Sequence, residues 1–397
     1  MEAPEVLSAD SSLSDLSTRA RAVAAIAANN AVSVDEAARF PAEACAALKE
    51  QRLLGVMVPR DFGGEGAGVA AVADICYTLG QACASTAMIY AMHQIKVACV
   101  TRHMRDNPVL NQIMRRLCAE QLLLASSTTE GQSGGNVRSS EAPVEYEDAR
   151  IRLERRASVI SYGAYADGIV TTARRSAEAV GSDQVLIAFL KNDYTLTRLQ
   201  GWNTLGMRGT CSEGYTLKAT GQTGQILPDP YEIIHAQTMV PFAHLLWGSV
   251  WTGIAANATA RAQMFIRQAM RGGNGQLPPG APQFTKALAS LRTLRGMLAN
   301  SLRAYERVMH DPKAVASVEF QSLITLTKVE ASEHAVAIVM SALRACGLSG
   351  YRSDGDFTIG RHLRDVLSSP IMINNDRILA NLATSSLMTP IPSSMRD

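Results

Sequence analysis

The 397-residue sequence lacks an excess of charge of either sign. Its 38 basic and 36 acidic residues leave a net charge of +2. A nucleic-acid-binding protein usually carries a clear basic surplus, so this balance argues against a nucleic-acid partner. The sequence also lacks the motifs HExxH, GxGxxG and HRD, and thus the short signatures of zinc proteases, dinucleotide-binding Rossmann folds and protein kinases.

Cysteine pairs with metal-ligand or redox spacing are missing as well. The seven cysteines form no CxxC or CxH pair, their number is odd and their spacing is irregular. We therefore predict reduced, buried thiols in a cytoplasmic protein, with no metal site and no disulfide framework. The cysteines are Cys45, Cys76, Cys83, Cys99, Cys118, Cys211 and Cys346.

Membrane-directed segments are not indicated. The N-terminal stretch MEAPEVLSADSS is acidic and polar, unlike a signal peptide. The most apolar run, residues 239–260, is interrupted by Pro241, His244, Ser249 and Asn257. That pattern favours a buried core helix over a membrane span.

Three blocks of different texture follow one another along the chain. Residues 1–121 have a helical apolar period, residues 122–237 are rich in short β-branched and aromatic runs, and residues 238–397 are helical again. Strands and helices do not alternate, which excludes a doubly wound sheet. We predict an α+β, mainly helical chain with an N-terminal helical domain, a central β domain and a C-terminal helical bundle.

Five stretches in this order resemble the acyl-CoA dehydrogenase superfamily over nearly the whole chain. They match the two flavin-binding strands, the strand that closes the β domain, the glycine turn near the C-terminus and the L-x-R-D segment after it. The stretches are LLASSTTEGQSGGN (123–136), SVISYGAYADGIV (158–170), LGMRGTCSEGYTL (205–217), SALRACGLSGY (341–351) and HLRDVLSSP (362–370). The resemblance implies the superfamily fold, with a central β-barrel domain and a four-helix bundle, and a flavin cofactor.

Cofactor-binding residues are carried over position by position from this resemblance. Ser161 stands where the family has a threonine beside the flavin N5 atom, and small residues let a flavin ring lie against the β domain. Strand-end hydroxyls that only satisfy the backbone are the alternative interpretation. The predicted cofactor-binding residues are Ser127, Thr128, Thr129, Ser133, Gly134, Ser158, Ser161, Arg267, Asn374 and Asn375. The cofactor is expected to be FAD, with FMN as the alternative.

The glutamate that acts as base in the dehydrogenases is missing from both of its usual positions. One position corresponds to Met372, Ile373 and Asn374, and the other to Ala243, beside His244. Abstraction of an α-proton needs a general base within reach. Ser158 also replaces the tryptophan that flanks the ring in the family, and Arg267 lies in a run without the usual F-G that follows the arginine at the FAD pyrophosphate.

These departures point to the monooxygenase branch of the superfamily, which includes dibenzothiophene and indole monooxygenases. Such enzymes take reduced flavin from a separate reductase, form a C4a-hydroperoxide and oxygenate a small molecule. The predicted function is hydroxylation of an aromatic or heteroaromatic, indole-like substrate. The predicted catalytic residues are Ser161, His93, Tyr90 and His244. For His93 a buried structural histidine is the alternative.

Two other functions stay open at this stage. One is an acyl-CoA or acyl-carrier-protein dehydrogenase with a relocated base, for which Glu330 and Glu333 are candidates on a face expected to be solvated or subunit-facing. The other is a non-catalytic flavoprotein. The resemblance further implies a homotetramer or dimer, with a flavin reductase as functional partner and neither nucleic acid nor membrane.

Overall fold

The computed structural model describes residues 9–130, 138–388, 391 and 393–394. Contacts divide the chain into two compact units, Met1–Ile234 and His235–Asp397. The helical and β blocks expected at the N-terminal end pack together as the first unit, and the second unit is helical in its described part. The mainly helical fold with short sheets is confirmed.

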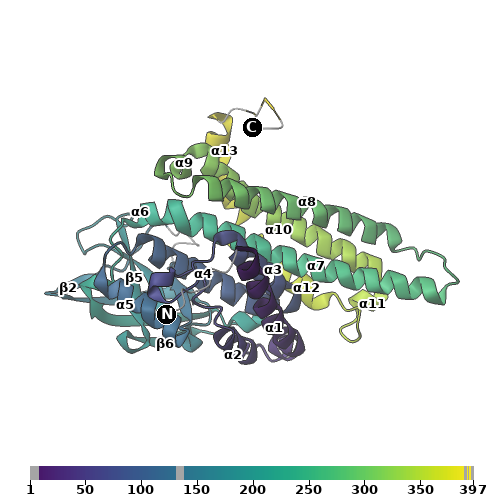
Figure 1. The fold of residues 1–397 in the computed structure, drawn as a ribbon, viewed down its shortest axis with the longest axis horizontal. Helices are drawn as coiled ribbons and strands as arrows, with labels where there is room; N and C mark the ends of the chain where they lie inside the picture. The colour runs from purple at the N-terminus through teal and green to yellow at the C-terminus, as the bar shows by residue number, and fades with distance from the viewer. Residues whose placement is uncertain (1–8, 131–137, 389–390, 392, 395–397) are drawn as a thin grey trace, which may run out of the picture. The chain divides into compact units, whose positions relative to one another are not determined.

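Five longer helices open the first unit. The apolar stripe of the first helix is formed by Leu16, Ala20, Val23 and Ala27, which are buried, and this helix packs beside the third (Figure 1). The fourth helix is buried on nearly all of its faces. The helices are α1 (Ala9–Glu36), α2 (Ala42–Glu50), α3 (Val69–Ala82), α4 (Ala84–His103) and α5 (Pro108–Glu120), with a 3-10 turn η1 (Arg60–Phe62) before α3.

Seven described strands form two sheets in the same unit. The first sheet has the order β1-β4-β5 and the second β2-β3-β7-β6, and β1 runs parallel to β4 while the other pairs are antiparallel. The strands are β1 (Leu124–Ser127), β2 (Glu145–Glu147), β3 (Arg150–Ile160), β4 (Gly168–Arg174), β5 (Gln184–Leu190), β6 (Tyr194–Gln200) and β7 (Glu213–Gln222). Short turns η2 (Gly163–Tyr165), η3 (Lys191–Asp193), η4 (Arg208–Thr210) and η5 (Thr223–Gln225) and helix α6 (Tyr231–Ile234) complete it.

Three long helices make the bundle of the second unit. Figure 1 shows α7 (Val240–Gly272), α8 (Ala281–Val308) and α10 (Val318–Cys346) running side by side. The shorter α12 (Gly360–Val366) and α13 (Asn375–Met388) pack against α10. A π-turn η6 (His235–Met239) precedes α7, and α9 (Pro312–Ala316) and α11 (Leu348–Tyr351) flank α10.

One segment among the described residues is long and apolar enough to cross a membrane. It is the continuous helical run Tyr231–Gly272, which includes α7, and 89% of its apolar window is buried inside the protein. Burial of that extent is what the interrupted sequence pattern predicts for a core helix.

Candidate functional site

Ser161 lies directly after β3, where a register shift between Ala157 and Ile160 bends the strand against β7. Its hydroxyl oxygen is 2.8 Å from the Oγ of Ser212, and that oxygen is 2.7 Å from the Oγ1 of Thr210. Thr210 in turn donates its hydroxyl hydrogen to the backbone carbonyl of Met207 at 2.8 Å. Ser161 is half-buried, whereas Ser212 and Thr210 are buried. The family resemblance assigned residues 205–217 to the strand that closes the β domain, but it gave no role to the hydroxyls of Thr210 and Ser212.

Backbone strain is concentrated around the same hydroxyls. Tyr162, Met207 and Cys211 have φ angles of 44°, 52° and 45°, in the left-handed region that bulky residues rarely adopt. Such conformations persist only where surrounding contacts hold them, and they gather at functional sites. Here Tyr162 donates its amide hydrogen to Thr210 O at 2.8 Å, and Trp202 donates its indole hydrogen to Met207 O at 3.0 Å. Hydrogen bonds between the segments around Tyr162 and Thr210 therefore hold these conformations in place.

Strand β1 ends at the second group of predicted flavin-binding residues. The hydroxyl oxygen of Ser127 is fully buried and has no hydrogen-bond partner among the described residues. Thr128 and Thr129 follow it and are half-buried. A buried polar atom without a partner is costly, so Ser127 is a good candidate for a ligand contact. The predicted residues Ser133 and Gly134 lie outside the described residues, and Ser158 is exposed on β3.

A buried ion pair braces the end of β1. The guanidinium of Arg155 is fully buried, lies 3.6 Å from a carboxylate oxygen of Glu130 and donates to the Oγ1 of Thr172 at 2.9 Å and to the carbonyl of Thr172. Glu130 accepts hydrogen bonds from the amides of Glu141 and Ala142. Burial lowers the pKa of Arg155. Glu130 follows Thr129 directly, so this pair fixes where the hydroxyl segment ends.

His93 is enclosed rather than presented to a ligand. Its Nε2 donates to the carbonyl of Leu54 at 2.8 Å, and its Nδ1 accepts the amide hydrogen of Leu124 at 3.0 Å. Burial lowers the pKa of His93 to about 4, so the ring is neutral. Both ring nitrogens of His93 are thus hydrogen-bonded to the backbone, and neither is available for the predicted donation to a substrate. The bond to Leu124 instead holds the first residue of β1. Tyr90 is likewise fully buried, and burial raises the pKa of its phenol well above the usual value.

Acidification is expected to weaken the fold through His93. Its pKa is about 4 in the folded protein and 6.5 as the reference value, so the unfolded chain binds the extra proton first. The stabilising contribution is therefore complete above pH 6.5 and is lost as the pH falls towards 4. We expect about 2 kcal/mol of this loss between pH 7 and pH 5.

Urea denaturation of the wild type and His93→Gln at both pH values measures this contribution. The variant should be less stable at pH 7 but should lose about 2 kcal/mol less than the wild type on acidification. Parallel losses in the two proteins would show that His93 does not titrate in this way.

The remaining predicted catalytic and cofactor residues lie in the second unit. The Nδ1 of His244 donates to Ile324 O at 3.2 Å, and burial lowers its pKa to about 3. Arg267 is exposed near the end of α7. Asn374 caps α13 by accepting the amide hydrogen of Arg377 at 3.1 Å, which gives its side chain a structural role.

The segment that matches the missing base is held by a buried lysine. Lys328 on α10 donates to the carbonyl of Ile373 at 2.8 Å and to the amide oxygen of Asn375 at 2.6 Å. The amide nitrogen of Asn375 donates to Ser332 and Glu333, so its predicted cofactor contact is replaced by this cluster. Ile373 has a φ of 50°, and burial lowers the pKa of Lys328 to about 8. The lysine thus holds a strained turn, and the sequence pattern did not reveal it.

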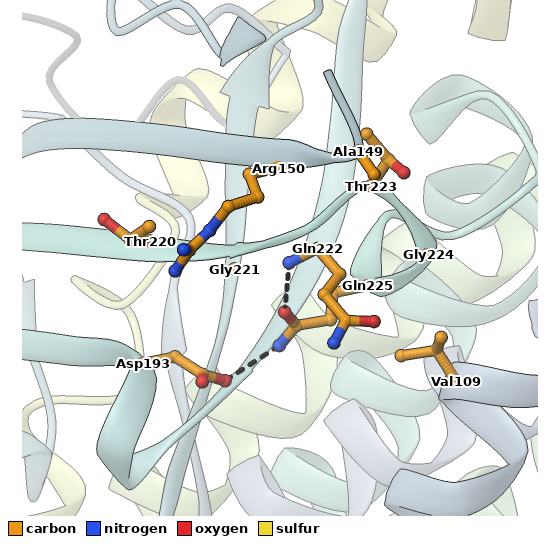
Figure 2. Close-up of a pocket in the computed structure, with 10 residues that line it drawn as sticks. All are labelled: Val109, Ala149, Arg150, Asp193, Thr220, Gly221, Gln222, Thr223, Gly224 and Gln225. Atoms are coloured by element: carbon orange, nitrogen blue, oxygen red, sulfur yellow. Dashed lines mark hydrogen bonds between the residues drawn. The ribbon is translucent and has the colours of Figure 1, made fainter. Parts of the chain in front are cut away.

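The first unit has a cleft of about 740 Å³. Figure 2 shows the residues that line it. Within it the side chain of Gln225 accepts from the amide of Gln222 at 2.7 Å and donates to Asp193 at 2.8 Å. The polar atoms of the Gln225 side chain are therefore satisfied within the cleft, and none of the predicted site residues lines it. The lining residues are Val109, Ala149, Arg150, Asp193, Thr220, Gly221, Gln222, Thr223, Gly224 and Gln225.

Comparison with known proteins finds acyl-CoA dehydrogenases by sequence and monooxygenases by structure. Residues 14–106 match the family "Acyl-CoA dehydrogenase, N-terminal domain". Cyclohex-1-ene-1-carbonyl-CoA dehydrogenase of Geobacter metallireducens is 24% identical over 91% of this chain and 94% of its own length. FMN-bound TdsC from Paenibacillus sp. A11-2, a dibenzothiophene monooxygenase also solved with FMN and indole, superposes with a TM-score of 0.83 at 16% identity, covering 95% and 98% of the two chains. Methanesulfinate monooxygenase MsuC from Pseudomonas fluorescens superposes at 0.81 with 18% identity over 98% of each chain.

The dehydrogenases and monooxygenases to which this chain is similar are flavin-dependent oxidoreductases. Residues 14–106 of this chain match the N-terminal domain family of the acyl-CoA dehydrogenases, and the chain has an acyl-CoA dehydrogenase-like fold, which confirms the fold that the resemblance implies. The residues present fit a flavin: Ser127 has an unsatisfied buried hydroxyl, and Thr128, Thr129 and Ser161 are half-buried hydroxyls on the β domain.

Proposed function

We propose that this protein is a flavin-dependent monooxygenase that uses reduced flavin and dioxygen to hydroxylate an aromatic or heteroaromatic, indole-like small molecule. The observation that carries the proposal is the absence of a carboxylate at either base position of the dehydrogenases, Met372–Asn374 and Ala243. A reaction that removes no α-proton does not need that base. The structural likeness to TdsC and MsuC supports the same choice.

The residues of this chain are proposed to act in two ways: some contact the flavin, and others hold the flavin-contacting segments in position. Ser161 is proposed to contact the flavin beside N5, and Ser127, Thr128 and Thr129 its polar edge. His93 is proposed as a positioning residue, because it holds the first residue of β1 from one side while the Tyr162 hydroxyl donates to Leu124 O at 3.0 Å. The flavin supplies the oxygen-activating chemistry when bound, and the protein orients it and excludes water.

The assembly and the source of reduced flavin are part of the same proposal. The protein is proposed to work in the cytoplasm as a homo-oligomer, a tetramer or dimer, with a separate flavin reductase. The family resemblance implies FAD as the cofactor, and FMN is the alternative. The absent F-G after Arg267 and the FMN in the solved TdsC structure support FMN.

An acyl-CoA dehydrogenase is the second candidate, favoured by the 24% identity with the Geobacter enzyme over most of both chains. The two glutamates that could serve as a relocated base, Glu330 and Glu333, do not support this second candidate. Glu330 is exposed and lies 3.6 Å from the imidazole of His334, and Glu333 is exposed and accepts from Asn375. Neither is enclosed as a base that takes an α-proton usually is.

Isotopically labelled dioxygen tests the proposed reaction. The protein, FMN, NADH and a general flavin reductase would be incubated with indole, dibenzothiophene and related fused rings. We expect a product that carries oxygen from dioxygen and that is absent without the protein. Ser161→Ala should form less of this product and release more hydrogen peroxide, because one preorganised contact is lost. Labelled product of equal yield without the protein would contradict the proposal.

A further inference from the structure

The three hydroxyls beside the proposed flavin site form a chain whose direction is fixed from its inner end. The single hydroxyl hydrogen of Thr210 points to Met207 O, 2.8 Å away, an oxygen that also accepts from the Trp202 indole and the Thr210 amide. The Oγ1 of Thr210 is then an acceptor for Ser212 at 2.7 Å. Ser212 has one hydrogen, which this bond uses, so its oxygen accepts the hydrogen of Ser161 at 2.8 Å.

Ser161 is consequently left with lone pairs and no free hydrogen on its outer side. The other two hydroxyls are enclosed by the protein, because Ser212 and Thr210 are only 5% and 3% exposed. The indole of Trp202 also fixes the terminal carbonyl of Met207, and the amide of Tyr162 fixes Thr210 O. Reversing the direction of the three hydroxyls would lose the hydrogen bond from the Thr210 hydroxyl to Met207 O, although this oxygen would keep the Trp202 indole and the Thr210 amide as donors. The observed direction is therefore favoured by one hydrogen bond.

The two redox states of a flavin differ at the atom that such an acceptor meets. Reduced flavin carries a hydrogen on N5 and donates it, whereas the N5 of oxidised flavin has a lone pair and only accepts. An oxygen that can only accept forms a hydrogen bond with the first and repels the second. One hydrogen bond gained or lost at a site of this kind changes an equilibrium constant by up to about 10-fold.

We propose that Thr210 and Ser212 are specificity-determining residues that orient Ser161 as a hydrogen-bond acceptor and so make the site select reduced over oxidised flavin. This rests on the proposed function, in which Ser161 lies beside N5. The selection suits a protein that receives its flavin already reduced and must release it once oxidised. Neither residue needs to touch the flavin, because each acts through the next hydroxyl.

Two different substitutions should reverse the orientation of Ser161. In Ser212→Ala the hydrogen of Ser161 loses its inner acceptor and turns outward. In Thr210→Val the hydrogen of Ser212 has only Ser161 left as acceptor, which again turns the Ser161 hydrogen outward. Both variants should bind oxidised flavin more tightly and reduced flavin more weakly. Ser161→Ala, by contrast, should weaken reduced flavin without strengthening the oxidised form to the same degree.

Anaerobic equilibrium titration with oxidised and dithionite-reduced FMN measures the ratio of the two dissociation constants. We expect wild-type protein to prefer reduced FMN, and Ser212→Ala and Thr210→Val each to lower that preference about 10-fold. For a two-electron couple this equals a midpoint potential lower by about 30 mV, which spectroelectrochemistry checks independently. Ser301→Ala is the matched control, because it removes one member of another buried hydroxyl pair, 2.8 Å from Thr327, in the bundle.

The possible outcomes distinguish a failure of the orientation argument from a failure of the proposed function. An unchanged ratio in both Ser212→Ala and Thr210→Val, alongside a changed ratio in Ser161→Ala, overturns the orientation argument and leaves the proposed function standing. Wild-type protein that binds neither form of FMN or FAD overturns both. A fall of the same size in Ser301→Ala would show that loss of any buried hydroxyl pair produces the effect, and would also overturn the inference.

Discussion

Saturated acyl-CoA thioesters are expected to leave the flavin of this protein oxidised in the absence of oxygen. At the C-terminal position Met372 and Ile373 are apolar, and Asn374 caps a helix. At the other position Ala243 has no functional group, and the neighbouring His244 is buried with a pKa of about 3. Losing a general base slows such a reaction by about 10²- to 10⁴-fold.

Stopped-flow absorbance with a series from butyryl- to palmitoyl-CoA measures this reduction. The same thioesters with a known acyl-CoA dehydrogenase serve as the positive control, and dithionite shows that the flavin of this protein can be reduced at all. Loss of the oxidised flavin spectrum within seconds of adding a thioester would contradict the expectation and restore the dehydrogenase candidate.

Substitution of Arg155 should be among the most destabilising changes in the first unit. Arg155→Met removes the cation that lies 3.6 Å from the buried carboxylate of Glu130, and it removes one of the two side-chain donors to the Thr172 carbonyl, the other being the Thr171 hydroxyl. Breaking one side of a buried ion pair typically costs about 3 to 5 kcal/mol. Chemical denaturation followed by circular dichroism gives the free energy of unfolding directly.

The double variant Arg155→Met/Glu130→Gln distinguishes this cause from a simple packing defect. It removes the buried negative charge, but the glutamine oxygen can accept from only one of the Glu141 and Ala142 amides, because these donate to different carboxylate oxygens of Glu130. Its stability should recover part of the loss seen in Arg155→Met. Equal losses in the single and the double variant would show that the volume of the arginine, and not its charge, stabilises this part of the β domain.

Sequence reasoning placed the elements better than it placed the side chains. The order of blocks follows from periodicity, which local residues determine, whereas the flavin-binding strand segments follow from the resemblance to the acyl-CoA dehydrogenase superfamily. The burial of Arg155 could also have been predicted from the sequence, because in β3 it points to the same face of the sheet as the buried Ile151 and Leu153. A charged residue on that face must be buried and paired, and this signal was missed.

Other roles depend on contacts between distant segments and had no local signal. Nothing near His93 indicates that Leu54 and Leu124 would occupy its two nitrogens, 39 and 31 residues away. Lys328 meets Ile373 across 45 residues in the same way. The hydroxyl of Ser161 was predicted as a ligand contact, but its orientation depends on Ser212, which lies 51 residues further along the chain.

The reaction of the reduced, flavin-loaded protein with dioxygen tests the central claim most directly. Anaerobic protein with photoreduced FMN would be mixed with oxygenated buffer and followed from the reduced to the oxidised spectrum, beside free reduced FMN. A monooxygenase is predicted to show a transient species before the oxidised spectrum, and the transient should decay faster when an indole-like substrate is present. Direct reoxidation with no transient, at a rate unaffected by any such substrate, would contradict the account.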